Sequence, residues 1–154
     1  MVSTKHLRFL GNLTVVMLLA FTVACGPSLT LTDVDYSQPM ESVASPDQNG
    51  MVNYIGTGIS FDVTPLNVKE RGEGAALPEK VRIIRNRDGY YFVTAPGYRN
   101  VYVFTPEERA LKMEERIRVS DAGLANPAFN QQGTHIQLID GNTELRLSKS
   151  GIVN

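Results

Sequence analysis

Few side chains in this sequence have the capacity for chemistry. The 154 residues include one cysteine, Cys25, and two histidines, of which only His135 follows that cysteine. A nucleophilic triad would need His135, with Asp140 to orient it and Ser120 or Ser148 as the attacking group. No serine has the glycine spacing of a nucleophile elbow, and one histidine with one cysteine is too few for a zinc site. We therefore expect no enzyme activity, no cofactor and no bound metal.

Paired carboxylates are the second possible source of chemistry, because two of them can cleave a glycosidic bond. The candidates are Glu107, Glu108, Glu114 and Glu115. They lie among lysine and arginine, and the sequence shows no apolar pocket beside them to raise the pKa of one carboxyl. We interpret these glutamates as a solvated edge.

Arginine and tyrosine are concentrated between residues 80 and 102. The candidate partner-binding residues are Arg85, Arg87, Tyr90, Tyr98, Arg99 and Tyr102. On adjacent strands they would form a face of guanidinium groups and flat rings, suited to a protein partner, an anionic glycan or a lipid headgroup. The alternative is that these residues only cover a solvent-facing sheet. In both cases the residues expected to pack inward are Val81, Ile83, Val93, Val101 and Val103.

The elements that must position these residues are strands. Short β-branched and aromatic runs separated by turn residues predict an all-β or β-dominated domain over residues 51–154, a small antiparallel meander or sandwich of about seven strands. The predicted strands are residues 59–63, 81–86, 90–94, 101–104, 134–139 and 143–147, with a seventh after residue 110. Asp88-Gly89 and Asp140-Gly141 predict hairpin turns. Residues 69–78 and 121–133 are expected to be loops.

Residues 105–120 fit two structures. Thr105-Pro106-Glu107-Glu108 has the composition of a helix start, which favours a short helix near residues 106–117. Against this, apolar residues alternate with polar ones from Leu111 to Val119, and only Glu115 breaks the period. This alternation favours a turn followed by a strand.

The first 24 residues have the layout of an export signal. Lys5 and Arg8 precede an apolar run over residues 13–24. That run has 12 residues, fewer than the roughly 20 that a membrane-spanning helix needs. The segment predicts export of the chain without a permanent membrane helix.

The end of this segment resembles the signal of bacterial lipoproteins. In that family a four-residue lipobox ends in a cysteine that is acylated and becomes the first residue of the mature protein; here it would be Thr22-Val23-Ala24-Cys25. The family usually has leucine at the first of these positions, where this chain has Thr22. The same segment also fits an ordinary secretory signal cut after Ala24, which would leave Cys25 as a free thiol.

The resemblance implies a lipid anchor on Cys25. Two or three acyl chains, including palmitate-type fatty acids, would hold the protein on a membrane stably, whereas one chain holds only marginally. The family's inner-membrane retention signal is usually aspartate after the cysteine, and Gly26 stands there, which favours the outer membrane. Residues 25–50 would form the lipidated cysteine and a flexible tether.

Charge and size limit the function classes. After residue 24 the chain keeps 13 of its 15 basic residues and all 16 acidic ones, a net charge of −3, and nothing in this balance points to nucleic acid. The remaining 130 residues suffice for one domain. We expect a lipid-anchored envelope protein that serves as a non-catalytic accessory or assembly subunit for an envelope protein partner. The alternative is a module that binds cell-wall or surface glycan.

Lipidation of Cys25 can be tested by metabolic labelling with a fatty-acid analogue. The wild-type protein should be labelled and Cys25→Ser should not, because the acyl chains attach through the thiol. Equal labelling of the two proteins would contradict the lipoprotein interpretation.

Overall fold

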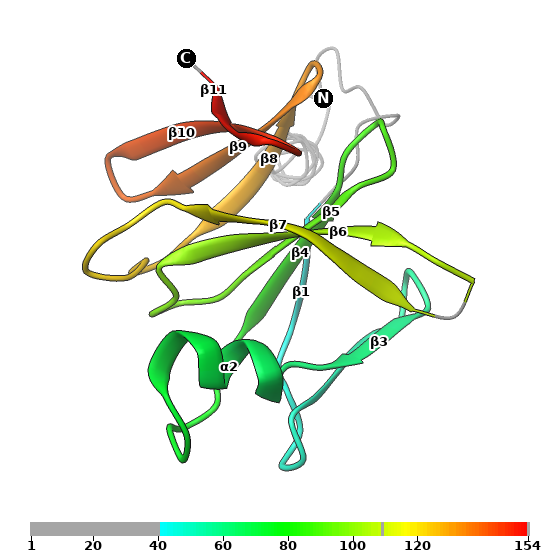
Figure 1. Cartoon of the computed structure of the whole chain (residues 1–154), viewed down its shortest axis with the longest axis vertical. Helices are drawn as coiled ribbons and strands as arrows, with labels where there is room; N and C mark the ends of the chain where they lie inside the picture. The colour runs from blue at the N-terminus through cyan, green and yellow to red at the C-terminus, as the bar shows by residue number, and fades with distance from the viewer. Residues whose placement is uncertain (1–40, 109, 154) are drawn as a thin grey trace, which may run out of the picture. The chain divides into compact units, whose positions relative to one another are not determined.

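Eleven strands and one short helix make up the part of the chain that the structure describes, residues 41–108 and 110–153 (Figure 1). The structure is a computed structural model. In chain order the elements are β1 (Ser42–Ala44), β2 (Met51–Tyr54), β3 (Ile59–Asp62), α2 (Thr64–Arg71), β4 (Val81–Arg85), β5 (Tyr91–Thr94), β6 (Asn100–Pro106), β7 (Leu111–Arg118), β8 (Ala128–Gln132), β9 (His135–Asp140), β10 (Thr143–Ser148) and β11 (Gly151–Val153). The predicted β-dominated, antiparallel class is confirmed.

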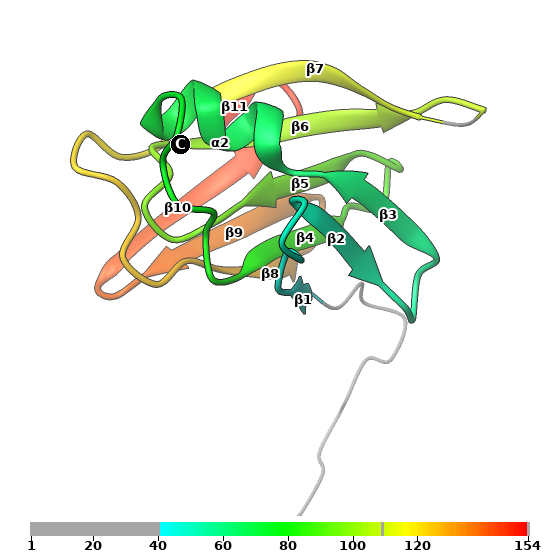
Figure 2. The same cartoon turned by 90° about the horizontal axis from the view of Figure 1, so that it is seen from below.

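Three antiparallel sheets form the domain. A five-stranded sheet has the order β1-β4-β5-β6-β7, a four-stranded sheet has the order β11-β10-β9-β8, and β2 pairs with β3 alone. The turned view shows the four-stranded sheet on one side of the five-stranded sheet, with the β2–β3 hairpin and α2 on the other (Figure 2). The five-stranded sheet is therefore the middle layer.

Both faces of this middle sheet are buried. On one face Val81, Ile83, Val93 and Tyr102 pack with side chains from β2, from α2 and from the turn before β6. The side chains of the first core are Val52, Tyr54, Val63, Leu66, Val81, Ile83, Val93, Ala95, Tyr98 and Tyr102. The Tyr54 hydroxyl donates a hydrogen bond of 2.8 Å to the Val81 carbonyl and so ties the hairpin layer to β4.

A second core fills the space between the five- and four-stranded sheets. It consists of Ile84, Phe92, Val101, Val103, Ile117, Leu124, Phe129, Ile136, Leu138 and Leu147. The expected inward packing of the five valine and isoleucine side chains is confirmed, although they divide between the two cores. A sheet covered on both faces carries apolar residues at consecutive positions, as Phe92 and Val93 do.

The strongest difference from the sequence-based expectation is α2. Pro65 occupies the first turn of this helix, where its missing N–H costs no hydrogen bond. The Asp62 carboxylate accepts a 2.8 Å hydrogen bond from the Thr64 N–H, and Lys69 and Arg71 lie in the last turn, which suits the helix dipole. The predicted loop over residues 69–78 is thus wrong at its start. β1, β2, β8 and β11 also lie outside the predicted strands.

Residues 111–118 are a strand, so the alternative of a helix near residues 106–117 is wrong. A turn closed by a 2.8 Å hydrogen bond from the Glu107 N–H to the Ala110 carbonyl joins β6 to β7. Val103 pairs with Glu115 but Phe104 pairs with Met113, so Glu114 is the extra residue of a β-bulge. This bulge explains the break in the alternation, and it turns Leu111 and Met113 to the opposite face from Ile117.

The chain joins the sheet earlier than the predicted domain start at residue 51. Ser42–Ala44 pairs with Val81 to Ile83 as edge strand β1, so these residues are not tether. The adjacent Glu41 forms an ion pair of 2.7 Å with Arg82 and accepts a 3.0 Å hydrogen bond from the Phe129 N–H of β8. One carboxylate therefore links the start of the domain to both large sheets.

The predicted signal over residues 1–24, Cys25 and the tether as far as residue 40 lie outside the described residues. Within residues 41–108 and 110–153, no helix has the length and apolarity needed to cross a bilayer.

Glu41 should make stability depend on pH. Burial raises the pKa of this carboxyl above its ordinary value of 4.5, against the opposing effects of the Phe129 N–H and Arg82. The folded protein then holds this proton more tightly than the unfolded chain. The resulting stabilisation is complete below pH 4.5 and is lost as the pH rises through the raised pKa.

As the pH rises from about 4 to about 7, the free energy of unfolding of the wild type should therefore fall relative to that of Glu41→Gln. Urea unfolding at several pH values measures it, with Glu79→Gln as the exposed control. A difference that stays constant across this range would contradict the assignment.

Candidate anion-binding pocket

The six predicted partner-binding residues do not form one face. Tyr98 and Tyr102 are fully buried in the first core, so assigning them to a binding surface is wrong. The reason is that α2 covers the side of the sheet that was expected to face solvent. Tyr98 and Tyr102 instead contact each other edge to face, with ring centroids 6.5 Å apart.

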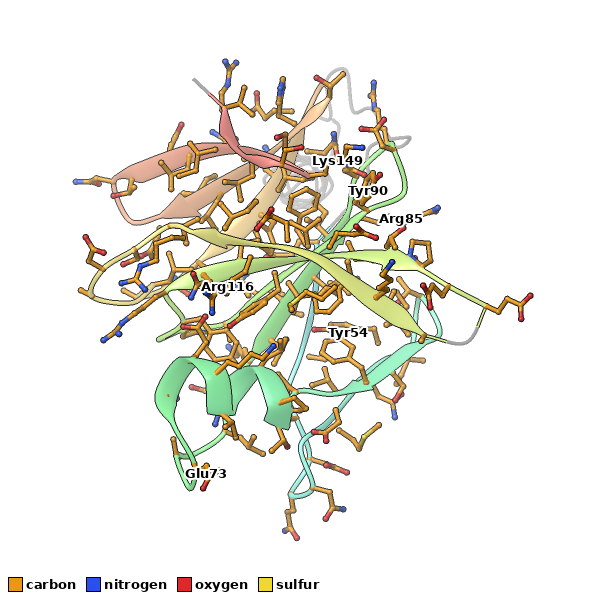
Figure 3. All side chains as sticks on the ribbon, in the orientation of Figure 1. Tyr54, Glu73, Arg85, Tyr90, Arg116 and Lys149 are labelled. Carbon is orange, nitrogen blue, oxygen red and sulfur yellow. The ribbon has the colours of Figure 1, made fainter. Side chains whose placement is uncertain are left out.

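The remaining four predicted residues lie at separate places. The Arg85 guanidinium lies over the Tyr91 ring, 5.7 Å from its centroid. Tyr90 packs against the second core, and Lys149 lies 5.0 Å from the centroid of its ring (Figure 3). Arg87 is exposed in the turn before β5, and Arg99 lies elsewhere, just before β6.

Arg99 belongs to a pocket of ≈ 400 Å³ on the α2 side of the middle sheet. We call it the cationic pocket. Its lining residues are Lys69, Glu70, Arg99, Asn100, Arg116, Arg118 and Asp121. Four of these seven side chains are cations and two are carboxylates, so the local charge is positive although the chain as a whole is slightly negative.

Strand register places the arginines. In the β6–β7 pair Asn100 lies opposite Arg118, and Tyr102 lies opposite Arg116. Residues directly opposite each other share a face, so Arg116 and Arg118 point to the same side as Tyr102. Figure 3 shows Arg116 on the α2 side of the sheet. Ile117 between them points into the second core and anchors that stretch of β7.

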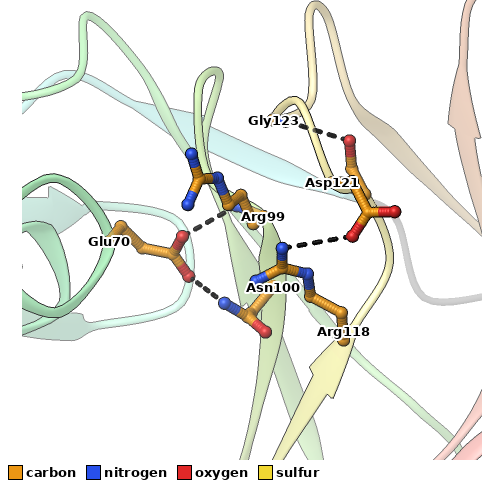
Figure 4. Close-up of polar contacts among 7 residues, drawn as sticks. Glu70, Arg99, Asn100, Arg118, Asp121 and Gly123 are labelled. Atoms are coloured by element: carbon orange, nitrogen blue, oxygen red, sulfur yellow. Dashed lines mark hydrogen bonds and ion pairs between the residues drawn. The ribbon is translucent and has the colours of Figure 1, made fainter.

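Glu70 of α2 forms the floor of the pocket (Figure 4). One carboxylate oxygen accepts hydrogen bonds from the Asn100 amide at 2.7 Å and the Tyr102 hydroxyl at 2.8 Å. The other accepts a 2.8 Å hydrogen bond from the Arg99 N–H. Burial and the bond to Glu70 raise the pKa of the Tyr102 hydroxyl, which keeps it protonated as a donor. Three donors thus hold the Glu70 carboxylate in one orientation.

The turn before β6 is held by the next residue of the helix. The Arg71 guanidinium donates to the Pro96 carbonyl and, at 3.3 Å, to the Ala76 carbonyl. It also lies 5.8 Å from the centroid of the Tyr98 ring. Gly97 faces this guanidinium and has φ +81°. This left-handed backbone conformation favours glycine at the position.

The cations of the pocket differ in their partners. Arg118 forms an ion pair of 3.2 Å with Asp121. Among the residues that the structure describes, the side chains of Lys69, Arg99 and Arg116 have no hydrogen bond or ion pair. Exposed guanidinium groups suit a carboxylate, phosphate or sulfate, which they bind through paired N–H groups, and the four cations outnumber the Glu70 and Asp121 carboxylates of the pocket.

The residues considered for catalysis are not brought together. His135 and Asp140 are the first and last residues of β9, about 16 Å apart along the strand. The Asp140 carboxylate accepts hydrogen bonds from the Ala125 and Asn126 N–H groups and so holds a loop. In residues 41–108 and 110–153 no three histidine, cysteine or acidic side chains are grouped as a metal site.

Sequence reasoning found Arg99 but missed Lys69, Arg116 and Arg118. The spacing of Arg116 and Arg118 around Ile117 places both on one strand face, which is a usable signal. Nothing in the sequence places Lys69 in the same pocket, because its position depends on where α2 packs. Comparison with known proteins adds nothing, because no protein-family model, curated protein or solved structure matches the chain.

Loss of the Glu70 carboxylate should destabilise the fold. Glu70→Ala would leave the Asn100 amide and the Tyr102 hydroxyl without their acceptor, and we expect a loss of about 2 kcal/mol in the free energy of unfolding. Glu73→Ala, an exposed glutamate just beyond α2, should cost less than about 0.5 kcal/mol. Urea unfolding measures both; equal effects would contradict the floor role of Glu70.

Proposed function

We propose that this protein is a lipid-anchored, non-catalytic accessory subunit of the cell envelope that docks an acidic group of a partner protein in the cationic pocket. The observation that carries the proposal is the set of three cations, Lys69, Arg99 and Arg116, around the hydrogen-bonded Glu70 carboxylate. Cations without an internal partner do little for the fold, but they favour the approach of an oppositely charged surface.

The anchor and the pocket support the same function. A lipid on Cys25 would keep the protein at a membrane, and the 15 residues between Cys25 and Glu41 would span at most about 50 Å. A domain restricted to that distance meets partners in the same membrane layer at high effective concentration, so a modest pocket suffices for binding. Gly26 stands where lipoproteins retained at the inner membrane usually have aspartate, so the proposed membrane is the outer membrane.

A second candidate is binding of cell-wall or surface glycan that carries carboxylate or phosphate groups. The pocket volume of ≈ 400 Å³ favours it, because pockets of about 300–1,000 Å³ hold compact ligands. A protein partner and a glycan would use the same cations, so variants of the pocket test both candidates and the nature of the ligand separates them.

The test compares Arg99→Gln and Arg116→Gln with Arg146→Gln, an exposed arginine of β10 on the other large sheet. Binding is measured by cross-linked pulldown from solubilised envelope and by co-sedimentation with purified peptidoglycan. Each pocket variant should weaken binding about tenfold, equivalent to roughly 1.4 kcal/mol, and Arg146→Gln should not.

The two assays distinguish the candidates. If the pocket variants lose binding only to one protein partner, the accessory role is supported. If they lose binding only to peptidoglycan, the glycan module is supported. Binding that is the same in wild type and in both pocket variants would remove the cationic pocket from the function. A fall in affinity with increasing salt is expected in either case, because the contacts are between charges.

A further inference from the structure

A second hollow lies on the same side of the middle sheet, between β3 and the end of the β6–β7 hairpin. We call it the apolar groove; its volume is ≈ 650 Å³. Its lining includes all of β3, the aromatic side chains of Tyr91 and Phe104, and Glu107, Glu108 and Leu111. It shares no lining residue with the cationic pocket.

The groove exposes the outer side of the first core. Ile59, Phe61, Tyr91 and Phe104 pack against that core but remain only partly buried. The β-bulge at Glu114 turns Leu111 to the face of Phe104, so a further apolar side chain lines the groove. Large apolar side chains that line a concave surface mark a binding site more often than scattered ones do.

One wall of the groove is a strand edge. β3 pairs with β2 through Met51 to Tyr54, and within residues 41–108 and 110–153 no strand pairs with its other side. All four residues of β3 line the groove. An open edge of four residues, about 13 Å long, offers backbone N–H and C=O groups to an incoming strand.

The rim of the groove is acidic. Asp62, Glu107 and Glu108 line it, and of the described lining residues none is basic. Glu107 and Glu108 are exposed in the turn between β6 and β7. Arg109, the next residue in the chain, lies outside the described residues. The charge of the described lining residues is thus opposite in sign to that of the cationic pocket.

We propose that the apolar groove binds an extended, basic segment of a protein partner, which pairs with β3 as an added strand. Alternate apolar side chains of that segment fill the groove, and its lysine or arginine side chains face Asp62, Glu107 and Glu108. This inference goes beyond the function proposed above, because it uses a different surface and a partner segment of opposite charge.

The test uses three labelled ten-residue peptides and the full chain in detergent. One alternates valine with lysine, one alternates valine with glutamate, and the third is the valine–lysine peptide with alternate backbone nitrogens methylated. The valine–lysine peptide should bind at least tenfold more tightly than the other two, because methylation removes the N–H donors that strand pairing needs. Hydrogen exchange of the amides of residues 59–62 should slow when it binds.

Variants locate the binding. The double variant Glu107→Gln/Glu108→Gln, at exposed positions that should not affect folding, and Leu111→Ser should each weaken the valine–lysine peptide about fivefold or more. Arg99→Gln and Arg116→Gln should not, so failure of this inference is distinguishable from failure of the cationic pocket.

Three results would overturn the inference. The first is that the valine–glutamate peptide or the methylated peptide binds as tightly as the valine–lysine peptide. The second is a dimer in sedimentation that Leu111→Ser dissociates, which would make a second copy of the chain the occupant. The third is displacement of the peptide by phospholipid added to the detergent solution, which would assign the groove to acyl chains.

Discussion

The structure depends on one constraint, the burial of the five-stranded sheet on both faces. Ile84 and Phe92 point into the core shared with the four-stranded sheet, while Ile83 and Val93 point into the core beneath β2, β3 and α2. An apolar sheet exposed on either side would lose that stabilisation, at about 25 cal/mol for each Å² of apolar surface left in water. Every other element is placed by the need to cover one of these faces.

The register of the β6–β7 pair then decides which side chains lie beside α2 and the β2–β3 hairpin. Near Asn100 the α2 side carries Arg116 and Arg118, and near Phe104, after the bulge, the same side carries Leu111. One face of one strand pair therefore has a cationic pocket toward one end and an apolar, acid-rimmed groove toward the other. Two surfaces of opposite charge on one small domain suit a protein that joins components.

The candidate site was predictable only in part, and particular residues show why. Arg99 stands out in the sequence because tyrosines surround it, yet Tyr98 and Tyr102 are core residues. Composition cannot separate these roles, because a tyrosine ring buries well and its hydroxyl needs only one partner, which Glu70 supplies to Tyr102. Glu70 itself comes from a helix that the sequence analysis did not find, since eight residues with a proline are too short for a clear helical period.

The sequence by itself determined the class of the fold and the positions of six strands, and it left residues 105–120 open between a helix and a seventh strand. These follow from local patterns, because side chains on a strand alternate at period two and glycine turns permit few connections. Only the tertiary structure decided that the middle sheet is covered twice, that Ser42–Ala44 belongs to it, and that Lys69 lines the same pocket as Arg99 and Arg116. Such contacts join segments far apart in the chain. Consecutive apolar residues such as Phe92 and Val93 are typical of a sheet buried on both faces, but they do not specify which elements cover each face.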